Sequence, residues 1–389
     1  MKKVYIFDAK RTPMGSFMGE LSSKSAVDLG IEPIKAITHR IASNSIEEIV
    51  MGCVLPAGLG QAPARQAALN AGLSEHIAAS TVNKVCGSGL KAIMMAADSI
   101  QLGRINLGIA GGMESMSNAP YLLPKIRQGY KYGHTKMLDH MAFDGLEDAY
   151  EPGLSMGVLA ERLAEKYQFS REKQDAYAYE STQKAQKALE SGLFSSEIVP
   201  ITIEGRTPYT MESDEGPRKA KPEKIPSLRP AFKKDGSITA ASASPISDGA
   251  AALLLGSEES ARSLGVKPRA IIRAYSTYSH SPQWFTTAPV NAINKVLQDT
   301  GWTVRDVDLF EINEAFAVVP LAAIKDLSIP TEKINAHGGA LVLGHPLGAS
   351  GARVVVTLLH ALERYNLKKG IAALCIGGGE GVAIAIEII

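Results

Sequence analysis

The chain has 389 residues, more than one ordinary hydrophobic core holds and enough for two or three fused units. It is 45% hydrophobic and 21% charged, the balance of a folded soluble protein, and 41 Lys and Arg residues face 40 Asp and Glu residues. This neutrality excludes the net field that attracts nucleic acid or an anionic membrane, so neither is an expected partner. No window approaches the ~20 apolar residues of a membrane span.

The first residues, MKKVYIFDAKRTP, predict a strand rather than a signal peptide, because Asp8 interrupts a short apolar run. The cysteines are Cys53, Cys86 and Cys375. An odd and sparse set argues against a disulfide framework and for a reducing compartment, so we expect a cytoplasmic protein.

Two stretches repeat one pattern: an acidic turn, an apolar strand, a small-residue turn that opens an amphipathic helix, and a buried strand ending in Gly-Gly-x-Glu. The repeat matches Ile49 to Val307, Gly89 to Gly351 and Glu114 to Glu380. It predicts an α/β fold built from a duplicated unit, with chance similarity of two α/β segments as the alternative.

The sequence between the repeats differs in composition, with many Tyr, Lys, Glu and Pro residues. Within it, Ser170 predicts the N-cap of a surface helix that ends at Glu190, and 207–230 predicts irregular loop. An insertion this long is expected to carry function. The predicted division is an N-terminal half of 1–117 plus 245–265, an inserted loop domain at 118–244 and a C-terminal half at 266–389.

Cys86 lies between a strand-like segment and a helix, with Gly87 and Gly89 beside it. The N-terminus of a helix favours a thiolate, and glycine lets a ligand approach the backbone closely. A small buried thiol at a tight turn would give the same local pattern, so a nucleophile and a structural cysteine both remain open.

Three further residues each have a possible catalytic role and a possible purely structural role. His345, between Gly and Pro, suits a general base, although a loop histidine without a role fits too; no second metal ligand lies at suitable spacing. Cys375 ends a buried strand, where core packing is usual, but the glycines from Gly377 onward could offer N–H groups to an oxyanion. Asn313 could orient a water or cap a helix.

No cofactor motif is found. The glycine-rich segments do not match a dinucleotide fingerprint, there is no Walker motif, and His134, Asp139 and His140 lie in a Lys- and Tyr-rich loop that predicts solvated side chains. Cys53 is interpreted as packing.

Four separate motifs together resemble the thiolase family over essentially the whole chain. They are VNKVCGSGLKAI, NEAFA, GGALVLGHPLGASGAR and CIGGGEGVA, supported by RTPMGSFMGEL, GQAPARQAALNAG, GGMESMSNAP and LRPAFKKDGSITAASASPISDGAAALLL. The resemblance implies two similar halves in a five-layered fold with an inserted loop domain. It also implies a homodimer or homotetramer, with acyl-CoA and CoA as substrates and no cofactor or metal.

The resemblance also implies a role for each matching residue in a reversible condensation of acyl-CoA thioesters. Cys86 would carry the acyl group, His345 would accept its proton and Cys375 would handle the α-proton. One oxyanion hole would use His345 and a water on Asn313, and the other the N–H groups of Cys86 and Gly377. The CoA contacts would be Ser244 at the pantetheine, Arg218 near the adenine, and Met156 and Phe316 at the acyl pocket.

The sequence departs from the family pattern outside the four catalytic positions. Ser155 stands before Met156 where acetoacetyl-specific members carry His, Ser242 and Pro245 replace Asn and Gly, and His337 replaces a common Asn. These changes leave the chain-length preference open.

Two alternative functions share the scaffold. A decarboxylating ketosynthase would need a histidine at Cys375, and an inactive binding protein would be expected to have lost one of the four catalytic residues. All four are present.

Overall fold

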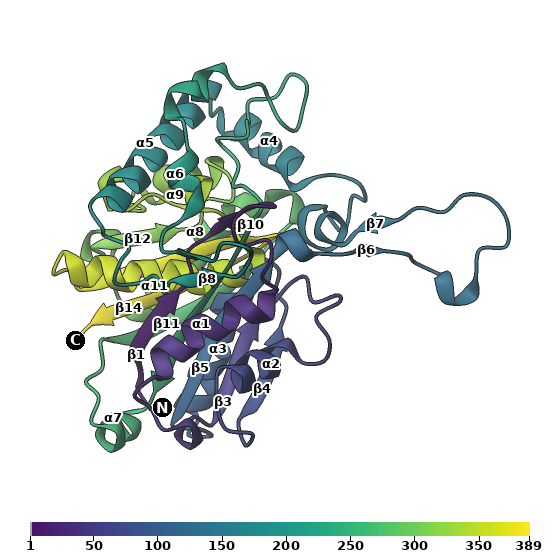
Figure 1. The fold of residues 1–389 in the computed structure, drawn as a ribbon. Helices are drawn as coiled ribbons and strands as arrows, with labels where there is room; N and C mark the ends of the chain where they lie inside the picture. Colours follow the sequence, from purple (N-terminus) through teal and green to yellow (C-terminus); the bar gives the residue numbers. More distant parts are fainter. Residues whose placement is uncertain (1) are drawn as a thin grey trace.

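The computed structural model describes residues 2–389, and its centre is one mixed sheet of ten strands (Figure 1). The spatial order is β12, β13, β14, β11, β1, β10, β5, β3 and β4, and the short β2 pairs with β10. β3 runs parallel to β4 and β5, and β12 runs parallel to β13. The bounds are β1 (Val4–Arg11), β2 (Gly15–Ser16), β3 (Glu48–Gly52), β4 (Ala78–Val82), β5 (Leu107–Ser115), β10 (Ser247–Gly256), β11 (Ala270–Ser279), β12 (Leu309–Ile312), β13 (Lys369–Ile376) and β14 (Glu380–Ile388).

The sheet confirms the predicted duplication. β1 pairs with β11 at the seam between the halves. From that seam outward, one half continues as β10, β5, β3, β4 and the other as β14, β13, β12. At the outer edge of the first half, β4 pairs in parallel with β3. At the outer edge of the second half, an isolated parallel bridge between Phe310 and Ile334 stands in the place of such a strand.

One predicted match within the repeat is wrong. Glu114 lies inside β5, whereas Glu380 opens β14, beyond the turn that follows β13. Gly52, the last residue of β3, pairs with Gly112, and Ile312, the last residue of β12, pairs with Ala373. Two residues beyond these partners lie Glu114 in β5 and Cys375 in β13, so Cys375 is the position equivalent to Glu114. The glycine-rich ending misled the comparison because it falls within a strand in one half and in a turn in the other.

Helices complete five layers, as the fold class predicts. α1 and α2 cover one face of the first half, α3 and α11 lie between the halves, and α8 and α9 cover the outer face of the second. The helix bounds are α1 (Ala26–Thr38), α2 (Pro63–Asn70), α3 (Ser88–Gln101), α7 (Glu258–Leu264), α8 (Ala288–Thr300), α9 (Val318–Leu327), α10 (Ala340–Leu343) and α11 (Leu347–Arg364).

The central helix α11 is buried along sixteen consecutive residues, from Leu347 to Leu362. Most of these residues are apolar or small, so the helix lies inside the protein rather than on its surface, and its few polar side chains are buried with it. It meets α3 where both chains carry glycine: a Cβ on Gly351 would lie 2.3 Å from the backbone nitrogen of Leu90, and one on Gly89 would lie 2.7 Å from that of Ala352. The two helix axes therefore approach closely only because neither position bears a side chain.

Within residues 118–244, the predicted insertion, α4, α5 and α6 lie in the upper part of the molecule in Figure 1, and β6 and β7 extend from the body as a hairpin. The bounds in this range are β6 (Tyr121–Leu122), β7 (Leu138–Asp139), α4 (Met156–Tyr167), α5 (Arg171–Glu190), β8 (Ile201–Ile203), β9 (Tyr209–Met211) and α6 (Glu215–Lys219). The predicted helix is confirmed as α5, whose N-cap Ser170 accepts a hydrogen bond from the N–H of Lys173.

Two buried polar networks attach the insertion to the halves. Arg11, at the end of β1, pairs with Glu197 and Asp214 at 2.6 and 2.7 Å. In the second half, Glu314 accepts hydrogen bonds from Tyr177 and Ser181 of α5. The first network explains why the prediction of irregular loop at 207–230 was wrong in part: β9 and α6 form on either side of the anchored Asp214.

Within residues 2–389, no helix combines the length and hydropathy that crossing a bilayer requires. In the same part of the chain, no three or more His, Cys, Asp or Glu side chains are grouped as a metal site.

We expect Gly351→Ala to destabilise the protein, although alanine is the better helix former by roughly 0.5–1 kcal/mol. The added methyl meets backbone of α3, and overpacking of this kind costs about 1–3 kcal/mol. Urea unfolding measures the difference. Gly205→Ala is the control, because a Cβ there meets nothing within 4 Å. An unchanged or increased stability of Gly351→Ala would contradict the close helix contact.

Candidate active site

Cys86 sits on a constrained turn between β4 and α3. The preceding Val85 has a φ of +47°, which a β-branched residue adopts only when its surroundings force it. Ser88 donates to the Val85 carbonyl at 2.7 Å, and the side chain of Asn83 accepts the Val85 N–H at 2.9 Å. These bonds fix the turn that presents Cys86 at the N-terminus of α3.

Cys86 is partly exposed, whereas Cys53 and Cys375 are buried. Burial raises the pKa of Cys86, and the nearby Glu114 raises it further. Backbone hydrogen bonds from Gly377 and from Cys86 itself act in the opposite direction on this pKa. The Cys86 sulfur therefore rests as a thiol, with two N–H donors beside it.

His345 lies in the loop between α10 and α11, and its ring geometry indicates which nitrogen can accept a proton. Nδ1 is 2.5 Å from the hydroxyl of Ser350, which donates its one hydrogen to the carbonyl of Pro346 at 2.8 Å. Nδ1 must then be the donor, which leaves Nε2 with the lone pair. Burial, with a smaller effect from the charge of Arg353, lowers the pKa of His345, so the ring is neutral at rest.

Asn313 follows β12 directly, as predicted, and is fully buried. Its Nδ2 lies 3.4 Å from both ring nitrogens of His345. Its Oδ1 accepts from Arg353 at 3.3 Å. The amide thus presents N–H donors beside the His345 ring.

Cys375 is the second-last residue of β13, before the glycines that lead into β14. Burial raises its pKa well above the ordinary value, and a charge on Cys86 would raise it further. The turn of Cys86 also meets the end of β13, because a Cβ on Gly87 would clash with the side chain of Ile376, the residue after Cys375. The structure therefore groups Cys86 with Cys375 and Gly377, and Asn313 with His345. Leu347, two residues after His345, belongs to the apolar cluster against which Cys86 packs.

The residues expected at the acyl pocket also gather here. Met156 Cε lies 3.5 Å from where a Cβ of Gly377 would sit. Phe316 packs edge-on against Phe232 and Phe285, with ring centroids 5.8 and 6.3 Å away. Ser155 is the N-cap residue of α4, immediately before Met156.

Two residues expected to contact CoA lie in different surroundings. Ser244 donates its N–H to the Ala315 carbonyl at 2.9 Å, which places it beside the Asn313 loop. Arg218 instead pairs with Glu20 at 2.9 Å. Its guanidinium is directed to that carboxylate, and Arg218 does not line the cavity described next.

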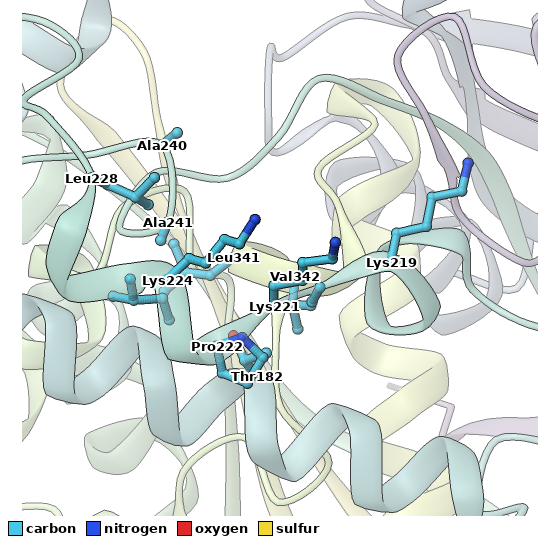
Figure 2. A pocket seen from close by; sticks show the side chains of 12 residues that line it. Thr182, Lys219, Lys221, Pro222, Lys224, Leu228, Ala240, Ala241, Leu341 and Val342 are labelled. Atoms are coloured by element: carbon cyan, nitrogen blue, oxygen red, sulfur yellow. The ribbon is translucent and has the colours of Figure 1, made fainter.

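A cavity of about 330 Å³ opens on the insertion next to α10 (Figure 2). Three lysines line its wall: Lys219, which also pairs with Glu215, and Lys221 and Lys224, which provide positive charge for an anionic ligand. Ala240 and Ala241 line the cavity too, and the chain then runs to Pro245, whose carbonyl accepts the N–H of His345 at 3.4 Å. One continuous segment therefore connects the cavity to the catalytic groups.

Sequence reasoning missed the lysines, Arg353 and the role of Glu114. The buried Glu114 carboxylate accepts the N–H groups of Val54, Leu55 and Gly348 at 2.8–3.1 Å. It therefore caps α11 from the opposite half of the molecule. The sequence does mark two of these features, since Glu114 lies in the GGMES motif and the lysines lie in the charged segment from Lys219 to Lys224. Neither pattern indicates which residues these side chains contact.

Comparison with protein families agrees with this arrangement. Residues 4–259 match the family model "Thiolase, N-terminal domain", and residues 266–388 match "Thiolase, C-terminal domain".

Full-length relatives agree as well. The chain is 50% identical over 395 residues to "Acetyl-CoA acetyltransferase" of Saccharomyces cerevisiae, covering 99% of each chain. It is 48% identical to the Escherichia coli protein of the same name, covering 100% of this chain and 99% of the relative.

Among solved structures, the Bacillus anthracis acetyl-CoA acetyltransferase superimposes with a TM-score of 0.97 at 42% identity, covering 100% of this chain and 99% of that one. The Acat5 thiolase from Ascaris suum in complex with coenzyme A gives 0.94 at 45% identity, with full coverage of both chains. The chain therefore belongs to the thiolase family and is an enzyme of that family.

Proposed function

We propose that this thiolase is an acyl-CoA:acetyl-CoA C-acyltransferase that works by a ping-pong mechanism through an acyl-Cys86 intermediate. It condenses two acetyl-CoA molecules to acetoacetyl-CoA and CoA, or cleaves short 3-ketoacyl-CoA in reverse. The observation that carries the proposal is that the turn of Cys86 meets the end of β13 beside Cys375 and packs against Leu347, two residues from the His345 that contacts Asn313. Relatives named acetyl-CoA acetyltransferase support the same reaction.

The first half-reaction transfers the acyl group. Nε2 of His345 accepts the Cys86 proton while the sulfur attacks the thioester carbonyl of acetyl-CoA. The N–H groups of Cys86 and Gly377 hold the oxyanion that forms. The bond to the CoA sulfur then breaks, the proton passes to that sulfur, and CoA leaves with Cys86 acetylated.

The second half-reaction forms the carbon–carbon bond. Nε2 of His345 first takes the proton of the Cys375 thiol, and the Cys375 thiolate then removes the α-proton of a second acetyl-CoA. The N–H that Nε2 now carries, together with a water on Asn313, stabilises the enolate oxygen. The carbanion attacks the acetyl group on Cys86, the carbon–sulfur bond breaks, and acetoacetyl-CoA forms. The α-proton stays on Cys375, and His345 returns its extra proton to the released Cys86 sulfur, so both thiols and the neutral ring are restored.

Bound CoA would span the path between the cavity and Cys86. Its phosphates suit Lys219, Lys221 and Lys224, and its pantetheine arm suits the segment from Ala241 to Pro245. A serine at position 155 leaves room beside Met156 for acyl chains slightly longer than acetyl. A direct contact of Arg218 with the adenine stays a prediction, as does the division at 118–244.

Incubation with acetyl-CoA alone should place an acetyl group on Cys86, located by intact mass and peptide mapping. Cys375→Ala should still acylate but condense on the order of 10²–10⁴-fold more slowly, because it lacks a positioned acid–base group. Cys86→Ala should lose both steps, and Cys53→Ala, in the other buried thiol, is the control. Acetylation confined to Cys375 or Cys53, or equal loss of acylation in Cys86→Ala and Cys375→Ala, would refute the assignment.

The pH dependence of acylation should separate His345 from the thiol. Burial raises the pKa of Cys86 to about 11, so the fraction of thiolate formed without a base falls as pH falls below that value. His345→Asn keeps a hydrogen-bond donor but removes the base. Its CoA-release rate should therefore be lowest near neutral pH and recover as pH rises. A rate that stays low and flat up to about pH 10 would show that proton acceptance is not the main role of His345.

Replacing Lys219, Lys221 and Lys224 together by Gln should raise the KM for CoA on the order of tenfold at low salt. Exposed ion pairs contribute about 0.2–1 kcal/mol each and are screened by salt, so the effect should shrink at high ionic strength. Lys234→Gln is the control, because this exposed lysine does not line the cavity. An unchanged KM in the triple variant would place the CoA phosphates elsewhere.

A further inference from the structure

The amide of Asn313 has two chemically different ends, and the reaction proposed above needs only one of them to face the site. An N–H end can hold a water or an oxyanion, whereas a carbonyl end would repel it. The backbone of Asn313 fixes the position of the side chain through its N–H to the Ala373 carbonyl at 2.9 Å. It does not fix which end of the amide points toward His345.

Arg353 supplies the missing constraint. One guanidinium nitrogen lies 3.3 Å from Oδ1 of Asn313, and the other lies 2.7 Å from Oε1 of Glu311. Arginine carries donors and no acceptor, so a flipped Asn313 would set N–H against N–H at this distance. The contact therefore selects the orientation in which Nδ2 lies beside His345.

The surrounding elements hold this guanidinium in place. Arg353 is 1% exposed and Glu311 4% exposed, so their ion pair is sheltered from water. Glu311 and Asn313 are two residues apart at the end of β12, where alternate side chains share one face. Arg353 lies one turn of α11 beyond Ser350, the residue that orients the His345 ring.

We propose that Arg353, braced by Glu311, is a positioning residue that turns the N–H end of Asn313 toward the catalytic centre. It orients the amide through its contact with Asn313, and its charge has a separate effect on the pKa of His345 that is smaller than the effect of burial. The proposal rests on the proposed function, because only a step that develops negative charge beside Asn313 requires this orientation.

A double-mutant cycle in the full-length protein tests the inference. One arm is Asn313→Ala, and the other is the pair Glu311→Leu with Arg353→Met, which removes both charges and leaves neither buried alone. We expect each arm to lower kcat for condensation on the order of 10²-fold, with the KM for acetyl-CoA and alkylation of Cys86 by iodoacetamide nearly unchanged. The combined variant should be no slower than Asn313→Ala, because the second change acts through the first. Multiplied losses would overturn the proposal.

Arg353→Lys keeps the positive charge but cannot donate to Glu311 and Asn313 at the same time with a planar guanidinium. If the Glu311→Leu and Arg353→Met variant does not fold, Arg353→Lys and Asn313→Ala provide a second double-mutant cycle. Its kcat should fall, and combining it with Asn313→Ala should add no further loss. Arg11→Lys is the matched control, since Arg11 is equally buried between carboxylates but does not contact the site. It should lower stability while kcat stays within about twofold. If the wild-type protein does not condense acetyl-CoA, the proposed function is overturned and this proposal with it. If the wild type is active but the losses of kcat multiply in the double-mutant cycles, this proposal alone is overturned.

Discussion

The contact between α3 and α11 at Gly89 and Gly351 sets the geometry on which the site depends. With no Cβ on either residue, the helices cross at backbone distance, and their N-termini open into the same space. Cys86 precedes α3 by two residues, and His345 precedes α11 by the same number. The proposed nucleophile and the proposed base come from opposite halves of the chain, and two glycines allow the helices that follow them to meet.

The duplicated halves provide equivalent positions but use them differently. Cys53 and Asn313 follow equivalent strands, and Glu114 and Cys375 occupy equivalent places in β5 and β13. In the first half, Glu114 binds three backbone N–H groups and caps α11, which is a structural use. In the second half, the smaller Cys375 leaves space beside Cys86. At this pair of equivalent positions, the first half thus contributes a structural residue, Glu114, and the second half contributes a residue of the proposed site, Cys375.

Sequence patterns predicted this fold, and they also place the proposed catalytic residues at strand ends and helix starts, because both depend on local order. Strand ends and helix starts are visible in periodicity and glycine, so the order of residues alone places Cys86 before a helix and Asn313 after a strand. Side-chain direction is a tertiary property and could not be predicted. Arg218 pairs with Glu20, and Arg353 reaches back to β12; nothing near either arginine in sequence indicates these partners. The repeat comparison failed at Glu380 because a one-dimensional match cannot separate strand from turn.

The buried site favours neutral groups until substrate arrives. Burial raises the pKa of both catalytic thiols and lowers that of His345, so neither a thiolate nor an imidazolium is stable there alone. The charge of Arg353 disfavours the imidazolium further, while Glu311 balances it within the pair. In the proposed reaction, negative charge forms on sulfur and then on an enolate oxygen, and N–H donors already in place stabilise it. Because these donors carry no formal charge, the site has no ion to solvate at rest, and stabilisation becomes effective only when negative charge forms.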